Sequence, residues 1–338
     1  MNPIRWAVVG PGRIAQRFAQ AVTALPDARL SWVQGRDEAR AQAFARQWSC
    51  ADSPPVRAGT SLAAVLAQPD VDAIYIATPH AFHAEAVRAC LQAGKPVLCE
   101  KPLVPNRAQG ETVVALARER GLFLMEAVWT RFLPVYAQVG AWLRDQAIGP
   151  VRGLQSSFCF AVPYDARTRL FDPVQAGGAL LDLGVYNLSM TRWVLQQATG
   201  TCAEPVAVLA HGRLAPTGVD RRVAATLVFE DAVTSQFVCG FDSQADNGLR
   251  IGGERGHIHL PHRFWEATQA VLHREGQAPQ TVDAPFAING FEGEIVEAMR
   301  CVRAGLVESP AMTHADTLAT LGWMDGLRQR LGVRYPFE

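Results

Sequence analysis

The sequence has no excess of charge of either sign, since 32 Lys and Arg residues balance 32 Asp and Glu residues over 338 positions. This balance excludes the strong positive field by which proteins bind nucleic acid. No apolar run is long enough to span a bilayer, and the first residues lead into an apolar strand pattern without the regions of a signal peptide. We therefore expect a soluble, cytoplasmic protein that binds neither nucleic acid nor a membrane.

Cysteines are scattered along the chain and form no Cys-x-x-Cys pair. Their number, seven, is odd, which is typical of reduced thiols in the cytosol rather than of a disulfide framework. Two histidines, His80 and His83, lie near the expected start of a helix, where a structural role is favoured over metal binding. We expect no metal site.

The first part of the chain alternates short apolar runs with helical patterns. The runs cover residues 4–9, 30–34, 72–77, 96–99 and 122–125, and Asp37 and Asn106 stand where helix caps are needed. Such alternation predicts right-handed βαβ units in a doubly wound parallel sheet. Because the length exceeds that of one growing core, we predict two domains that share a cleft, the first a Rossmann domain at 1–128.

From Trp129 onward the pattern changes to longer segments of period two, at 154–160, 223–229 and 234–241. These segments predict a mostly antiparallel open sheet. Helical patterns at 131–146, 177–196, 290–304 and 313–331 should cover one of its faces. We therefore predict an α+β domain at 129–338, although its last helices could equally pack back on the first domain.

The segment GPGRIA at residues 10–15 follows the first strand and opens the first helix. Gly10 and Gly12 allow a tight turn and a close approach to a pyrophosphate, and the helix N-terminus offers unpaired N–H groups. The spacing alone is weak, but its position between strand and helix is the context that a dinucleotide site requires.

The end of the second strand bears on the choice of cofactor. Gly35 stands where an NAD-binding domain usually carries an acidic side chain for the ribose. Arg36 can pair with a 2′-phosphate, so we predict NADP, while Asp37 one position later leaves NAD open.

Lys101 stands in VLCEKP at residues 97–102, where the fourth strand ends. The carboxyl end of a parallel strand faces the crevice in which ligands bind, and Pro102 should hold the lysine at a fixed turn. A solvated lysine at a strand end is the alternative that this segment alone would favour.

Asp182 and Tyr186 lie four residues apart in GGALLDLGVY at residues 177–186 and would share one helix face. A free tyrosine, with a pKa of about 10, is a poor base near neutral pH, but a nearby ammonium would favour the phenolate. Lys101 is the candidate for that ammonium. The alternative is a surface aspartate with a tyrosine in the core, against which the two glycines at the helix start argue.

Together GPGRIA, ATPHAFH, AGKPVLCEKP and GGALLDLGVY resemble the Gfo/Idh/MocA family of NAD(P)-dependent oxidoreductases over essentially the whole chain. The segment EAVWTRF at 126–132 and the ending YPFE are similar to the branch of dimeric dihydrodiol and NADP-dependent D-xylose dehydrogenases. Most of the wider family has histidine where Tyr186 stands, but this branch has tyrosine. Two departures, Ala176 for a glycine and Val104-Pro105 for a more common pair, remove no reacting group.

The resemblance implies a role for each matching residue. It assigns catalysis to Lys101 and Tyr186 and substrate orientation to Asp182. The residues that it implies at the cofactor are Gly10, Gly12, Arg13, Ile14, Arg36, Thr78, Pro79, His83, Glu100 and Lys101. Near the substrate it places Trp129 and Arg131 with Asp182 and Tyr186, although Trp129 could equally be a core aromatic residue.

We therefore expect hydride transfer between nicotinamide and a hydroxyl-bearing carbon of a small molecule, either a sugar or a cyclic trans-diol. Two alternatives stay open: a cofactor-dependent sensor without turnover, and a reductase of an unrelated carbonyl or imine. The resemblance also implies a homodimer or higher homo-oligomer that forms through the open sheet. The sequence does not identify the substrate.

Overall fold

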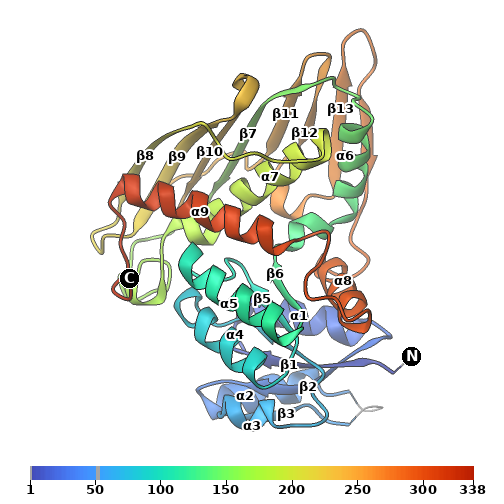
Figure 1. Ribbon diagram of the computed structural model, residues 1–338, viewed down its shortest axis with the longest axis vertical. Helices are drawn as coiled ribbons and strands as arrows, with labels where there is room; N and C mark the ends of the chain where they lie inside the picture. Colours follow the sequence, from blue (N-terminus) through green and yellow to red (C-terminus); the bar gives the residue numbers. More distant parts are fainter. Residues whose placement is uncertain (1, 51–53) are drawn as a thin grey trace. The chain divides into compact units, whose positions relative to one another are not determined.

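The computed structural model describes residues 2–50 and 54–338, which form two compact units (Figure 1). The first unit comprises Met1–Val128 and Ala287–Thr317, and the second comprises Trp129–Phe286 and Leu318–Glu338. Within the described ranges no helix is long and apolar enough to cross a membrane.

A six-stranded parallel sheet forms the centre of the first unit. Its order is β3-β2-β1-β4-β5-β6, so the direction of winding reverses between β1 and β4, as in a doubly wound sheet. The strands are β1 (Ile4–Val9), β2 (Ala28–Gln34), β3 (Arg57–Gly59), β4 (Ala73–Ile76), β5 (Val97–Glu100) and β6 (Leu124–Ala127). The predicted parallel sheet is confirmed, but β3 was missed and β6 begins two residues later than expected.

Helices of the first unit are α1 (Arg13–Ala24), α2 (Glu38–Trp48), α3 (Leu62–Leu66), η1 (His80–Phe82), α4 (His83–Gln92), α5 (Arg107–Arg120) and α8 (Glu292–Arg303). Asp37 accepts from the Arg40 N–H at 3.0 Å, and Asn106 accepts from the Gln109 N–H at 2.9 Å. Both predicted caps are confirmed. Strands β4 and β5 are buried along their whole length, as expected for a parallel sheet with covered faces.

Helix α8 belongs to the first unit, where it packs on α1. Arg17 on α1 donates to the Asn289 carbonyl at 2.6 Å, the Asn289 amide donates to the Arg17 carbonyl at 2.9 Å, and the Arg17 guanidinium lies over Phe291. The expectation that 290–304 covers the second sheet is therefore wrong. The alternative, that a late helix packs back on the first domain, holds for this one.

The second unit is built on an eight-stranded sheet of order β14-β13-β12-β11-β7-β10-β9-β8. Its strands are β7 (Val151–Cys159), β8 (Ala207–Leu214), β9 (Asp220–Val228), β10 (Thr234–Gly240), β11 (Leu249–Gly253), β12 (Gly256–Leu260), β13 (Gln269–Arg274) and β14 (Gln280–Asp283). Only β7 and β10 pair in parallel among these strands, so the predicted, mostly antiparallel sheet is confirmed. Five of its strands, β8 and β11 to β14, were missed.

One face of this sheet is covered by helices and the other is open. Figure 1 shows α6 (Pro134–Arg144) and α7 (Val185–Thr199) on the covered face, where α6 contacts β13 and β14 and α7 contacts β7 and β10. Along β9, Val223, Ala225 and Leu227 are buried and alternate with more exposed residues. This period of two is the pattern of a sheet with a single buried face.

Shorter helical segments complete the second unit. They are η2 (Trp129–Phe132), η3 (Pro173–Gln175), the π-helix η4 (Leu180–Gly184), η5 (Glu230–Ala232) and η6 (Phe264–Glu266). Helix α9 (His314–Leu331) contributes its residues from Leu318 onward to this unit.

Candidate active site

The turn between β1 and α1 has the geometry of a phosphate-binding loop. Gly10 has a φ of 95°, and a Cβ there would lie 2.8 Å from the Ala77 carbonyl oxygen. Gly12 occupies the N-cap position of α1 and has no side chain, so the first N–H groups of the helix receive no cap from this residue. Arg13, which is exposed, and Ile14 begin the helix. These donors and the helix dipole suit an anion such as a pyrophosphate.

Gly35, at the end of β2, stands where an NAD-binding domain usually has an acidic residue, and steric contact explains why no side chain fits there. A Cβ on Gly35 would lie 2.8 Å from the ring of Pro11, so the phosphate turn itself excludes a side chain at this position. Asp37 caps α2. Arg36 is exposed, and its guanidinium lies 5.6 Å from the centre of the Phe82 ring.

His83 connects two segments of the candidate site. Its ring lies between the Thr78 carbonyl, 2.8 Å from Nε2, and the Pro102 carbonyl, 2.9 Å from Nδ1. The ring is fully buried, and burial lowers the pKa of His83 below its usual value, so it is neutral and donates to one carbonyl at a time. The neighbouring Thr78 hydroxyl is buried and has no hydrogen-bond partner among the described residues, and Pro79 precedes η1.

Lys101 follows β5 directly, as predicted, and is half-buried. The buried Glu100 beside it accepts a hydrogen bond from the Tyr75 hydroxyl, and its other oxygen lies 3.3 Å from the Lys101 backbone N. Burial raises the pKa of Tyr75 well above its ordinary value, so Tyr75 remains a donor to Glu100. The first unit thus brings Thr78, His83 and the segment 100–102 together.

Tyr186 lies at the start of α7, directly after the π-helix η4 that carries Asp182. The sequence predicted one α-helix across both residues, and the wider π turn was missed. Tyr186 is 6% exposed, and the Trp129 indole N–H donates to its hydroxyl oxygen at 3.0 Å. Trp129 therefore contacts the predicted base directly.

Asp182 is paired with an arginine that the sequence analysis did not single out. Arg169 Nη1 lies 3.2 Å from Asp182 Oδ1, and Nη2 lies 3.5 Å from Oδ2. The aspartate side chain is only 10% exposed, whereas that of Arg169 is 45% exposed. Arg169 comes from an irregular segment, where periodicity gives no signal.

Tyr186 belongs to a group of aromatic side chains in the second unit. The Phe158 ring centre lies 5.6 Å from that of Tyr186 and is stacked at 3.4 Å on Trp265, and Phe286 lies 6.2 Å from Trp129. Sequence patterns could not reveal this cluster, because Phe158 is a strand residue and the others lie far along the chain. Of these rings, Phe158 packs against Tyr186 itself and Phe286 packs against Trp129, which donates to the Tyr186 hydroxyl.

Arg131, which was expected near the substrate, is buried and bound to α7. Its Nε donates to the Ser189 hydroxyl and its Nη2 to the Ser189 carbonyl, each at 3.1 Å. These contacts hold η2 against the helix that carries Tyr186.

Two family models match the chain. Residues 4–128 match the model described as an oxidoreductase family with an NAD-binding Rossmann fold, and residues 136–259 match the GFO/IDH/MocA C-terminal domain. The chain therefore belongs to the Gfo/Idh/MocA family of oxidoreductases.

Its curated relatives include trans-1,2-dihydrobenzene-1,2-diol dehydrogenases. The enzyme of Sus scrofa is 34% identical and that of Homo sapiens 33% identical, each match covering 98% of both chains. Among solved structures, a 3-ketoreductase from Actinomadura kijaniata in complex with NADP and TDP-benzene is 29% identical with a TM-score of 0.84, covering 97% of this chain and 98% of that one. These are enzymes to which this chain is similar.

Proposed function

We propose that the protein is an NADP-dependent dehydrogenase that moves a hydride between nicotinamide C4 and a hydroxyl-bearing carbon of a sugar or a cyclic trans-diol. The observation that carries the proposal is the Tyr186 hydroxyl, which is held at 3.0 Å by the Trp129 indole N–H one turn from the Asp182 carboxylate. An indole donor stabilises negative charge on the phenol oxygen. The dihydrodiol dehydrogenases and the NADP-bound ketoreductase among the relatives support the reaction class.

Each reacting group has a proposed task. Tyr186 removes the hydroxyl proton during oxidation, and Asp182, steadied by Arg169, orients the substrate hydroxyls. The Lys101 ammonium stabilises negative charge at the reacting oxygen. Bound NADP would supply the hydride acceptor, held by the N-terminus of α1, the Thr78 hydroxyl and Glu100.

The experiment is a screen of sugars and cyclic diols with NADP, read at the nicotinamide absorbance band, followed by Tyr186→Phe and Lys101→Met with a substrate that is turned over. We expect each substitution to lower kcat by at least about 100-fold, the scale of general acid–base catalysis. Near wild-type activity in either variant would contradict its assigned role. Tight NADP binding without turnover across the screen would favour the sensor instead.

The preference for NADP rests on Arg36. It is exposed beside the phosphate turn, and the residue before it cannot carry a carboxylate without striking Pro11. Arg36→Gln should raise the KM for NADP by about 10-fold and leave that for NAD nearly unchanged, because only NADP carries the 2′-phosphate. Equal changes for the two cofactors would contradict this role.

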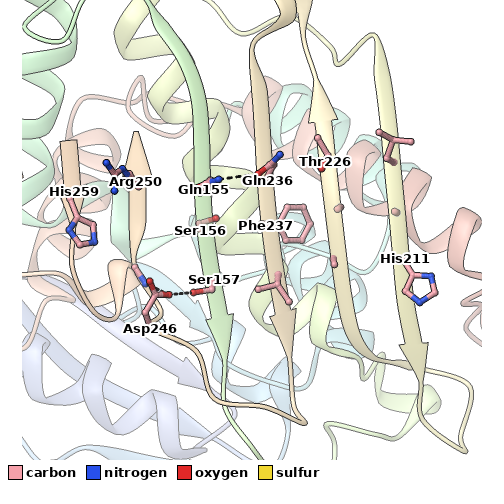
Figure 2. A pocket seen from close by; sticks show the side chains of 16 residues that line it. Gln155, Ser156, Ser157, His211, Thr226, Gln236, Phe237, Asp246, Arg250 and His259 are labelled. Carbon is pink, nitrogen blue, oxygen red and sulfur yellow. Dashed lines mark hydrogen bonds between the residues drawn. The ribbon is translucent and has the colours of Figure 1, made fainter. Parts of the chain in front are cut away.

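We also propose that the protein forms a homodimer through the open face of the eight-stranded sheet. Figure 2 shows polar side chains in rows across this face, where Gln155 donates to Gln236 at 3.1 Å and Ser157 donates to Asp246 at 2.6 Å. A hollow of about 840 Å³ lies there, lined by none of the predicted site residues. Leu209 on β8 lines this hollow and is 66% exposed, so a substitution there changes the surface of the open face.

Sedimentation of the wild type and of Leu209→Arg tests this interface. We expect a wild-type dimer at micromolar concentration that dissociates at least about 10-fold more readily in the variant, because an unpaired charge is buried at the contact. Val296→Arg, which alters an exposed valine on α8, is the control and should leave the dimer intact. A monomeric wild type would refute the proposal. We further propose a cytoplasmic location, which the odd number of seven cysteines supports.

A further inference from the structure

The turn at Gly177 and Gly178, which precedes η4, lies close to two other segments of the second unit. A Cβ on Gly177 would lie 2.7 Å from the Arg169 carbonyl oxygen. Gly178 has a φ of 120°, and a Cβ there would lie 2.4 Å from Asp220 Oδ1. Both glycines are therefore needed for close approach, and the second brings the chain against the Asp220 carboxylate.

Asp220 supplies the cap that the helix start lacks. Ala179 stands at the N-cap position of η4 and has no side chain that could accept a hydrogen bond. Asp220, which begins β9 some 40 residues later, accepts from the Leu180 N–H at 2.6 Å through Oδ2. A carboxylate at this place satisfies a helical N–H and opposes the positive end of the helix dipole.

The C-terminal segment holds the same turn from a second direction. The buried Tyr335 hydroxyl donates to the Gly177 carbonyl at 2.7 Å. Arg328 lies over the Tyr335 ring at 4.8 Å, and its guanidinium is bound by Glu338 and Asp325, each at 2.7 Å. Tyr335 is therefore fixed before it reaches the turn.

Two candidate catalytic side chains follow this turn on the same helical run. Asp182 lies two residues after Leu180 and Tyr186 six residues after it, both within the continuous helical run that Asp220 caps. Asp220 is fully buried, and a buried carboxylate is normally costly. The cost of burying this carboxylate makes stability alone a poor account of its presence, and its contact with the Leu180 N–H points to orientation of the turn.

We propose that Asp220 and Tyr335 are positioning residues, which fix the Gly177–Gly178 turn and thereby the directions of Asp182 and Tyr186. This inference rests on the proposed function, in which Tyr186 and Asp182 act on the substrate. Neither Asp220 nor Tyr335 touches the reacting atoms in this account. Each acts through the backbone at the start of η4.

The test measures kcat and the KM for NADP in Asp220→Leu, Asp220→Asn and Tyr335→Phe. Leucine has a similar volume but no acceptor, so we expect kcat to fall about 30-fold while the KM for NADP stays within about twofold. Asparagine keeps an oxygen that accepts from Leu180 and should restore kcat to within about fivefold of the wild type. Tyr335→Phe, which removes one hydrogen bond, should lower kcat about fivefold.

Asp242→Asn is the matched control, because this buried carboxylate of the second unit pairs with arginines rather than with a helix start. It should leave kcat unchanged. In the double variant Asp220→Leu with Tyr186→Phe the two losses should combine to less than their product, because the part of the Asp220 effect that acts through Tyr186 is absent once the phenol is gone and only the part that acts through Asp182 remains. If Asp220→Leu does not fold, Asp220→Asn and Tyr335→Phe carry the same comparison.

Wild-type kcat in both Asp220→Leu and Tyr335→Phe would overturn the proposal, as would losses that multiply in the double variant. These outcomes are separate from a failure of the proposed function, which would appear as full activity in Tyr186→Phe. An inactive Tyr186→Phe combined with fully active Asp220→Leu and Tyr335→Phe would leave the function standing and reject the positioning role.

Discussion

Two glycine turns open helices in this protein, and they are built for different purposes. The turn at Gly10 and Gly12 leaves the start of α1 without a side-chain cap, whereas the turn at Gly177 and Gly178 receives the Asp220 carboxylate on the first N–H of η4. A helix start that the protein leaves uncapped can bind a ligand anion. A helix start whose N–H group is already capped by a carboxylate of the protein has no such site for an anion, and the residues that follow it contribute through their side chains. In both turns the glycines let another group come close to the backbone. The neighbouring residues determine whether that group is a ligand or a side chain of the protein.

The largest expected effect is a dependence of stability on pH that comes from Asp220. Desolvation raises the pKa of this carboxyl to about 6 from an ordinary 3.8, and the folded state therefore binds its proton more tightly than the unfolded state. Its ionised form destabilises the fold at pH 7, and this penalty is relieved as the pH falls from 7 through 6 to about 3. The free energy of unfolding of the wild type, measured relative to Asp220→Asn, should rise by about 3 kcal/mol over that range.

Other groups facing Asp220 do not obscure this signal. Arg328 stays charged throughout, and burial raises the pKa values of Tyr335 and Cys239 well above their ordinary values, so both are neutral between pH 3 and 7. Urea titrations of both proteins at several pH values give the difference. A difference that stays flat, or that falls as the pH is lowered, would contradict a raised pKa.

Gly10→Val should affect cofactor binding and not the second unit. A side chain there needs a left-handed backbone and would strike the Ala77 carbonyl at 2.8 Å, which displaces the phosphate turn. We expect the Kd for NADPH, measured by fluorescence titration, to rise about 100-fold, equivalent to about 2.7 kcal/mol. An unchanged Kd would mean that the turn does not hold the pyrophosphate.

Gly178→Ala is the reciprocal experiment at the other turn. The new methyl group would lie 2.4 Å from Asp220 Oδ1 at a φ of 120°, so the turn must move. We expect kcat to fall about 30-fold with the Kd for NADPH within about twofold of the wild type. A large loss of NADPH affinity here would remove the contrast between the two turns.

The smallest expected effect is that of Trp129→Phe. Phenylalanine keeps the aromatic packing against Phe286 but cannot donate to the Tyr186 hydroxyl. Loss of one hydrogen bond of about 1 kcal/mol should lower kcat of the oxidation about fivefold and move the acidic limb of its pH profile to higher pH, because the phenolate loses a donor. A pH profile that coincides with that of the wild type would show that the indole serves only to pack.

Predictions from local sequence patterns, such as strand runs and helix caps, agreed best with the structure in the first unit. The run at 4–9 coincides with β1, and Asp37 and Asn106 cap the helices that they were expected to cap. These features depend on neighbours within a few residues, which periodicity and capping chemistry describe directly. Strand β3 was not predicted, because a strand of three residues is too short to show a hydrophobic period.

Predictions were poorer where partners come from distant parts of the chain. Strands β11 to β14 are held by pairing across the sheet, and α8 returns to α1 through contacts with Arg17. The sequence analysis did not identify three residues of the candidate site. In the fold, Arg169 lies beside Asp182, Trp265 beside Phe158, and Phe286 beside Trp129. None of these pairs shares a periodic pattern, so the sequence analysis could not connect them.

Sequence patterns were sufficient to predict the alternation of strands and helices in the Rossmann domain, the glycine turn before its first helix, and the candidates Lys101, Asp182 and Tyr186. Short-range sterics, capping and strand ends suffice for these, because each is decided within one or two elements. The long-range contacts came from the folded chain alone: Trp129 donates to Tyr186, Arg169 pairs with Asp182, and Asp220 and Tyr335 form hydrogen bonds at the turn before η4. Those contacts join residues 13 to 158 positions apart, and burial of the chain around a common core is what brings them within hydrogen-bonding distance.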